Sequence, residues 1–472
     1  MSYLVPREPA AVLGRALGAP LSEALAMLKL ATPIALVALV NMAMSLTDTV
    51  MAAAFGPTAL AAVAVGSDFY SILFYFSAGV VSGLGPYYAA ALAAGDAAAA
   101  SRLRRIGWLV TAVVATTALP VVWFAPHYLG LLGLDAALVA EGGGYTRAMA
   151  LTLVPMLCVA LFRTRLAAKE RPGVLLRVTL LAVPLNAALN YVLMFGIGDW
   201  NGYGITGAGI SSLVVASFIA GALCLLGRGR HDTAVASAMT ADGFMTVLRT
   251  GIQIGVTTVA EVGVFLGATL FAATLGAAEA AAHAVAMRTA GIAYALPSGL
   301  LQAAVVRGAR ADALATQAAR RRAISTALLV GAGVGMSLFA VLALAAQPGA
   351  DLLFGVSSMP DTRTMELAVG LLVLVGVMQI FDAPCAAAAG TLRGLRETRQ
   401  PMIYTLGGYW GVGVPSGLWL ALHTPFGVTG VWIGLVLGAA VTSALMFARI
   451  GRHWRAADVI GVRHGQSVRS GP

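Results

Sequence analysis

Charged residues are scarce in this chain of 472 residues: they make up 11% of it, whereas a soluble domain carries about a quarter. Hydrophobic residues make up 59%, and the mean hydropathy is +0.86. So few charges cannot cover the surface of a soluble protein, which excludes a water-soluble globular domain. The 55 glycines fit a bundle of membrane helices, where small residues let backbones approach closely.

Cysteine and histidine are also sparse. The three cysteines, Cys158, Cys224 and Cys385, each lie inside an apolar stretch, which excludes a disulfide framework and a thiolate metal site. The six histidines are dispersed without metal-binding spacing. Phosphate-binding P-loop spacing is absent, which excludes a built-in ATPase. We therefore expect no cofactor and no metal other than a coupling ion.

Lysine is nearly absent, although the net charge is +10. The basic residues are almost all arginines in short clusters between apolar stretches, so they form no single basic face. This pattern is typical of loops beside a membrane, and we expect no nucleic-acid partner.

Apolar stretches long enough to span a bilayer, about 20 residues each, predict an all-α integral membrane protein of twelve transmembrane helices. The first six fall near 30–54, 59–93, 107–130, 147–168, 174–197 and 206–227. The other six fall near 249–275, 280–306, 323–346, 366–391, 401–422 and 428–450.

The arginines lie on one side of this topology. Apart from Arg147, Arg288 and Arg363, every basic residue lies in the terminal segments, in alternate loops or in the helix ends beside those loops. Lys and Arg near helix ends are retained on the cytoplasmic face. Both termini are therefore predicted to be cytoplasmic. The N-terminal segment does not resemble a cleaved signal peptide, so we expect the first helix to remain in the membrane.

The chain divides into two halves that repeat one another. Gly56 and Gly79 match Gly276 and Gly299 at a constant offset of 220, and the motif at 204–207 recurs at 427–430. Six helices per half preserve orientation, which predicts two lobes related by a pseudo-two-fold axis along the membrane normal, with a cavity between them. The predicted segments are a cytoplasmic N-terminal segment 1–29, an N-lobe 30–227, a cytoplasmic linker 228–248, a C-lobe 249–450 and a cytoplasmic tail 451–472.

Four acidic residues lie well inside predicted helices: Asp48, Asp68, Glu261 and Asp382. A charge at bilayer depth costs about 2.5–3.5 kcal/mol, so such carboxylates are candidate functional groups. The alternative for each is a structural carboxylate hydrogen-bonded to neighbouring helices. A buried carboxyl can hold either a proton or a cation, and this competition is sufficient chemistry for antiport.

Two further features of the predicted helices could serve transport or packing. Arg288 lies deep in a helix, and the offset of 220 pairs it with Asp68. It is either packed in the lobe or forms an ion pair between the halves. Tyr70 and Phe74 belong to an aromatic cluster that could hold an organic cation or could pack the core.

Prolines mark helix positions that can bend, without indicating which one moves: Pro155, Pro184, Pro297, Pro384 and Pro415.

Several motifs, in order along residues 30–450, resemble the multidrug and toxic compound extrusion (MATE) family, in its NorM-like branch. They are Asn41 to Gly56, with Ala59-Leu-Ala-Ala-Val; Arg171-Pro172; Pro184-Leu-Asn186-Ala-Ala-Leu-Asn190-Tyr; Gln379-Ile-Phe-Asp382-Ala; and Gly390-Thr-Leu-Arg393-Gly394 with Arg399-Gln-Pro401.

The resemblance implies a polar site in the N-lobe formed by Asp48, Asn186 and Asn190. It also implies a cation site in the C-lobe at Glu261 and Asp382. A tyrosine expected one turn before Asp382 is replaced by Met378. Asp68 matches no family motif, and its candidacy rests on its depth alone.

These features predict a secondary active multidrug exporter, not an enzyme, that exchanges organic cations or drugs for Na⁺ or H⁺. The chain is expected to be a monomer in the inner (plasma) membrane, in contact with lipid. One alternative is a lipid-linked oligosaccharide flippase of the same superfamily, whose anionic cargo favours a basic cavity. Another is an integral-membrane enzyme, which needs catalytic groups clustered near a membrane surface. The sequence does not distinguish Na⁺ from H⁺.

Overall fold

The computed structural model describes residues 9–131, 133–227, 240–354 and 362–467. Helices build both halves of the chain. The N-lobe comprises α1 (Pro9–Ala53), α2 (Pro57–Ser82), α3 (Gly85–Ala93), α4 (Ala97–Trp123), α5 (Ala125–Leu131), α6 (Ala136–Ala168), α7 (Gly173–Phe195) and α8 (Ile205–Leu226). The C-lobe comprises α9 (Ala241–Leu275), α10 (Ala277–Ala313), α11 (Gln317–Phe354), α12 (Thr362–Gly394), α13 (Arg399–Thr405), η1 (Leu406–Gly413), α14 (Val414–His423) and α15 (Val428–Ser467).

Eleven stretches within the described ranges are helical, long and apolar enough to cross a membrane. One of them, residues 57–93, consists of α2 and α3 with a break at Gly83 and Leu84. The remaining predicted span, 401–422, is present as the consecutive helices α13, η1 and α14. The twelve-helix membrane architecture expected from the sequence is therefore confirmed.

The middle of that last span is a π-helix, η1. Four of its eight residues are glycines, which weaken the regular α-helical pattern. Gly408 also packs against α15 so closely that a Cβ there would lie 2.0 Å from Thr442 Oγ1. Close approach to α15 and low helix propensity together account for the wider turn.

Three helix ends differ from the segment boundaries expected from the sequence. Helix α1 begins at Pro9, α9 begins at Ala241 within the linker predicted at 228–248, and α15 continues to Ser467 within the predicted tail. Residues 228–239 of that linker, and the first eight and last five residues of the chain, lie outside the described ranges.

The internal repeat is visible in backbone and burial. Gly56 and Gly276 precede α2 and α10 with φ of 102° and 143°, a region that favours glycine. Residues 61–70 and 281–290 show the same order of buried, half-buried and exposed side chains. The two halves therefore present equivalent faces of equivalent helices, as the offset of 220 predicts.

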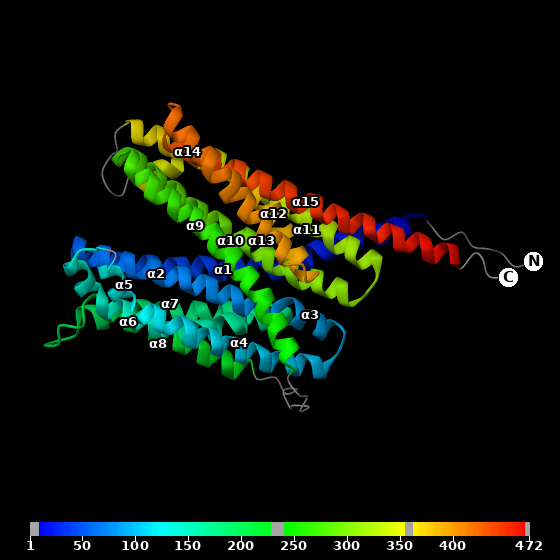
Figure 1. Cartoon of the computed structure of the whole chain (residues 1–472), viewed down its shortest axis with the longest axis horizontal. Coiled ribbons are helices and arrows are strands. Elements are labelled where there is room, and N and C mark those ends of the chain that lie inside the picture. Colours follow the sequence, from blue (N-terminus) through cyan, green and yellow to red (C-terminus); the bar gives the residue numbers. More distant parts are fainter. Residues whose placement is uncertain (1–8, 132, 228–239, 355–361, 468–472) are drawn as a thin grey trace, which may run out of the picture.

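The two lobes meet at the end of the molecule where α1 begins and α15 ends, and they diverge toward the opposite end (Figure 1). Near the meeting end, a Cβ on Gly79 of α2 would lie 2.6 Å from Gly255 Cα of α9. In the symmetry-related contact, a Cβ on Gly299 of α10 would lie 2.5 Å from the Ala31 carbonyl oxygen of α1. Glycine at these positions allows the backbones of the two lobes to touch.

Candidate functional site

The carboxylate of Asp48, on α1, lies beside two asparagines of α7. Asn190 Nδ2 donates to Asp48 Oδ1 at 2.5 Å, and Asn186 Nδ2 donates to the same oxygen at 3.4 Å. The two asparagines are four residues apart, so they lie on one face of α7. Both are buried, whereas Asp48 is half-buried. The structure therefore brings together the three residues that the resemblance implied for the N-lobe.

One atom of this N-lobe group has no hydrogen-bond partner. Asn190 Oδ1 is buried and accepts no hydrogen bond from any described residue. A buried acceptor left unpaired costs about 1–3 kcal/mol. The carboxylate can hold a proton, and together with a free amide oxygen it suits a hard cation, which favours oxygen ligands.

Tyr145, on α6, also belongs to this region and was not expected from the sequence. Its side chain is buried and interacts electrostatically with Asp48 and Asp68. Asp68 itself is exposed on α2. No motif or spacing in the sequence distinguishes Tyr145 from the other tyrosines, and only the packing of α6 against α2 reveals it.

The C-lobe carboxylates lie on two different helices. Asp382, on α12, is 7% exposed, and Tyr409 Oη of η1 donates to its Oδ1 at 2.9 Å. Glu261, on α9, is half-buried and interacts electrostatically with Arg393 and Asp382. Whether these carboxylates hold one cation stays a prediction.

Three more residues of the C-lobe join this group. Tyr294 of α10 interacts electrostatically with both Glu261 and Asp382. Gln379, almost one turn before Asp382, is fully buried, and neither of its amide atoms finds a hydrogen-bond partner among the described residues. Tyr409 supplies the aromatic hydroxyl that Met378, 2% exposed, does not. The sequence assigned none of the three a role in the site, although Gln379 stands in a motif that resembles the MATE family, because a site shared by four helices leaves no local pattern.

The aromatic candidates of α2 lie partly inside the N-lobe. The rings of Tyr70 and Phe74 stack with centroids 5.8 Å apart and planes 5° apart. Tyr70 is 6% exposed, although its hydroxyl finds no hydrogen-bond partner among the described residues, and Phe74 is half-buried. The stacked pair therefore packs within the lobe and offers part of one ring to a ligand.

Asp68 and Arg288 occupy equivalent positions in the two lobes. Each lies eleven residues before an interlobe glycine, Gly79 or Gly299, and eleven residues are about three helical turns. Each charged residue therefore lies on the same helix face as its glycine. Both are exposed. They lie on the part of α2 and α10 where the lobes diverge.

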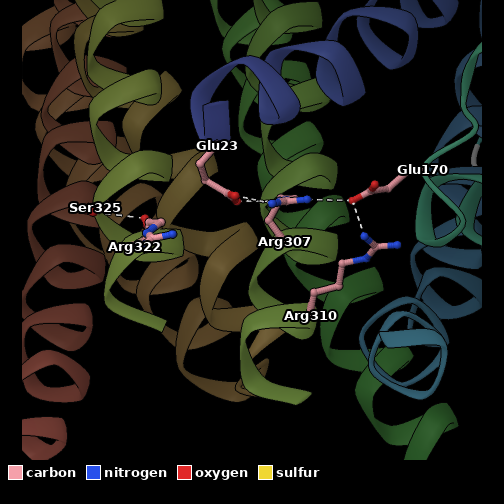
Figure 2. Close-up of polar contacts among 6 residues, drawn as sticks. All are labelled: Glu23, Glu170, Arg307, Arg310, Arg322 and Ser325. Carbon is pink, nitrogen blue, oxygen red and sulfur yellow. Dashed lines mark hydrogen bonds and ion pairs between the residues drawn. The ribbon is translucent and has the colours of Figure 1, made fainter. Parts of the chain in front are cut away.

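An ion-pair network joins the lobes at the opposite, meeting end (Figure 2). Arg307 Nε of α10 donates to Glu23 Oε1 of α1 at 2.6 Å, and Arg307 Nη1 lies 3.0 Å from Glu170 Oε1, just after α6. Arg310 Nη1 lies 2.9 Å from the same Glu170 oxygen. Because Glu23 and Glu170 belong to the N-lobe and both arginines to the C-lobe, the network links the two lobes at this end.

Comparison with known proteins identifies related sequences and folds. The MatE family model matches residues 33–192 and 253–419. The "Probable multidrug resistance protein NorM" of Mesorhizobium japonicum is 32% identical over 450 residues, covering 94% of this chain and 96% of the relative. The "Multidrug resistance protein NorM" of Burkholderia vietnamiensis is 32% identical over 422 residues, covering 89% and 91%.

Solved structures match the fold over nearly the whole chain. The eukaryotic MATE transporter AtDTX14 superposes with a TM-score of 0.82 at 21% identity, covering 93% of this chain and 99% of that one. An outward-facing multidrug resistance MATE family transporter of the MOP superfamily superposes with a TM-score of 0.82 at 18% identity, covering 92% and 96%. The two-lobe arrangement of this chain is therefore shared with transporters of known structure.

Proposed function

Because this chain belongs to the MATE family, we propose that it is a secondary active exporter of organic cations and other drugs, driven by inward movement of Na⁺ or H⁺. The observation that carries the proposal is a pair of buried or half-buried oxygen-rich groups, one in each lobe, around Asp48 and around Asp382 with Glu261. Relatives of similar length are named multidrug resistance proteins, which supports a drug as cargo.

The described conformation suits the release step of transport. If the termini are cytoplasmic, as the arginine distribution predicts, the lobes meet on the cytoplasmic side and diverge toward the outside of the cell. The Arg307 network and the glycine contacts then close the inner entrance. Loss of these contacts would let the inner ends separate and admit substrate from the cytoplasm.

Coupling follows from competition for carboxylates. A cation or proton that enters from outside neutralises the C-lobe or N-lobe carboxylates and displaces a cationic substrate from the same charges. The membrane potential adds about 2.3 kcal/mol per elementary charge per 100 mV for inward movement. Neutral oxygen atoms beside each carboxylate, such as Tyr409 Oη and Asn190 Oδ1, would serve as further ligands for a dehydrated cation.

The two alternatives account less well for these observations. A flippase for anionic lipid-linked sugars favours a basic cavity, whereas the intramembrane groups here are mainly carboxylates and amides. The matched family and relatives are transporters, which argues against an integral-membrane enzyme. The relatives are bacterial, which supports the plasma membrane as the location.

Dye efflux from proteoliposomes under separately imposed gradients tests the proposal. We expect a cationic dye to be exported when either a Na⁺ gradient or a pH gradient is imposed, and the effective gradient identifies the coupling ion. Proteoliposomes without a gradient serve as the control. Dye efflux at the control rate under both gradients, with correctly inserted protein, would contradict ion-driven export.

A further inference from the structure

A cavity of about 290 Å³ opens between the ends of α4, α6 and α8, at the end of the N-lobe that carries the interlobe ion pairs. Its lining residues are Arg104, Arg105, Trp108, Phe162, Arg165, Cys224 and Gly227. Three of the seven are arginines, and none carries a carboxylate. The cavity is therefore strongly cationic and separate from the groups around Asp48 and Asp382.

Arg165 is the buried cation of this cavity. It is 7% exposed, and its guanidinium lies over the Phe162 ring, 5.5 Å from the centroid. Its Nε finds no hydrogen-bond acceptor among the described residues. A buried charged donor without an acceptor is costly. An anionic oxygen entering the cavity would supply the missing acceptor.

Positive charge continues beyond the lining residues. Burial lowers the pKa of Lys169, and the positive charges of Arg165, Arg104 and Arg171 lower it further. The nearby carboxylate of Glu170 is already bound to Arg307 and Arg310. Arg104, Arg165 and Arg171 therefore place like charges close to Lys169 in this part of the lobe.

Apolar side chains beside the cavity indicate that the anion belongs to a lipid. Trp108 is 41% exposed and packs edge-on against Phe162, with centroids 5.7 Å apart. Leu225 and Leu226, beside the lining residues Cys224 and Gly227, are 69% and 63% exposed. Tryptophan is enriched where helices cross the headgroup level of a bilayer. Acyl chains could lie along this surface while the headgroup enters the cavity.

We propose that this cavity binds the phosphate group of an anionic phospholipid, with Arg104, Arg105 and Arg165 as its donors. Arginine suits a phosphate because its planar donors match the phosphate oxygens. Basic pockets between membrane helices bind lipid headgroups in this way. The proposal concerns the lipid around the transporter and does not depend on the transported substrate.

Native mass spectrometry of the full-length protein in a neutral detergent tests the proposal, with phosphatidylglycerol, phosphatidylcholine and inorganic phosphate as separate probes. We expect phosphatidylglycerol to bind the wild type about tenfold more tightly than phosphatidylcholine, and the preference to be lost in Arg104→Gln/Arg165→Gln. Arg177→Gln removes an exposed arginine of the same lobe that does not line the cavity, and it should keep the preference.

Because Arg165 is buried, a second variant avoids any dependence on its packing. Arg105 is exposed, and Arg105→Gln should fold normally and weaken phosphatidylglycerol binding by several-fold. Equal binding of the two lipids by the wild type would overturn the proposal, as would an undiminished preference in both variants. Displacement of the lipid by inorganic phosphate at equal concentration would show a site for free anions, and it would overturn the lipid assignment.

Discussion

Asp48 accepts hydrogen bonds from the neutral amides of Asn186 and Asn190, so the charge of the carboxylate stays available to a cation. Asp48→Asn keeps the shape of the side chain and removes that charge. We expect efflux to fall by about tenfold or more, because a hydrogen bond or ion contact to a charged group is worth about 1.5–3 kcal/mol. The measurements are dye efflux at several external pH values, purified yield and thermal unfolding, and the last two should stay normal.

The matched control for Asp48→Asn is Asp96→Asn, in the same lobe. Asp96 caps α4 by accepting from Ala99 N at 2.8 Å, and asparagine caps a helix equally well. The Asp96→Asn variant should therefore transport at the wild-type rate. Near-normal efflux by Asp48→Asn would refute a role in binding. Collapse of its yield with normal specific activity in the surviving protein would identify a structural carboxylate.

Tyr409 donates the hydrogen bond that Asp382 accepts in the C-lobe. Tyr409→Phe removes only the hydroxyl, which leaves a buried carboxylate short of one donor at a cost of about 1–3 kcal/mol. We expect the ion concentration needed for half-maximal efflux to change, while the maximal rate changes less. The measurement is efflux against the size of the imposed ion gradient.

The exposed Tyr191 of the N-lobe provides the control for that experiment. Tyr191→Phe removes a hydroxyl from an accessible ring and should leave the ion dependence unchanged. An unchanged ion dependence in Tyr409→Phe would show that Tyr409 does not act through the cation site.

The sequence indicated the deep carboxylates because charges are rare inside apolar stretches. It also placed Asn186 and Asn190 beside Asp48 through the motif that they share with the MATE family, and the structure brings these three residues together. Tyr409 stands in none of these motifs, and the motif that contains Gln379 suggested a role only for Asp382. A hydroxyl or amide inside a membrane helix costs less than a charge, so it stands out less in a sequence.

At the scale of helices, the contact between α2 and α9 depends on Gly79 and Gly255. A Cβ on Gly255 would lie 2.7 Å from the Phe76 carbonyl oxygen, so Gly255→Ala requires the two backbones to separate. We expect the lobes to move apart at their meeting end, even though alanine gains about 0.8–1.0 kcal/mol of helix propensity. Spin labels at Arg177 and Arg399, both exposed on opposite lobes, would report a longer distance.

Gly267, on the same helix α9, is the control for Gly255. A Cβ at Gly267 meets nothing within 4 Å, so Gly267→Ala should keep the wild-type label distance and unfold at the same or a slightly higher temperature. If Gly255→Ala also keeps the wild-type distance, the glycine contact does not determine how closely the lobes approach.

The helices themselves were largely predictable, because long apolar stretches have few alternatives in a bilayer. The interruptions were not. The break between α2 and α3, and the π-helix η1 within the span 401–422, arise where glycines meet a neighbouring helix. Hydropathy measures only transfer into lipid, so it does not record how two helices pack.

At the scale of the whole molecule, one residue of the N-lobe pairs with two arginines of the C-lobe: Glu170 binds both Arg307 and Arg310. Glu170→Gln weakens these partly exposed ion pairs, and we expect the inner-closed state to lose population by several-fold at most, because such pairs contribute about 1 kcal/mol or less. The same spin labels measure the populations. Glu279→Gln breaks an ion pair with Arg363 inside the C-lobe and should not change them. Equal effects of the two variants would contradict a closing role for Glu170.

Asp68 and Arg288 are exposed at equivalent positions of opposite lobes, on faces that meet their partner lobe three turns away. When the diverged ends close, we expect these opposite charges to approach one another. Cysteines replacing both residues should form a disulfide more readily under conditions that favour the inward-open state. The pair Asp68→Cys with Arg363→Cys is the control, and equal cross-linking of both pairs would argue against a specific approach.

The glycine contact between α2 and α9 also has a mechanical consequence. If α2 tilts about its contact at Gly79, Asp68 lies eleven residues from that pivot, which is about 16 Å along an α-helix. A rotation of about 15°, like that between haemoglobin dimers, would move Asp68 by about 4 Å. In the C-lobe, Arg288 is separated from Gly299 by the same number of residues. A small tilt at the glycine contacts of Gly79 and Gly299 could therefore move the diverged ends of both lobes by about the width of a side chain.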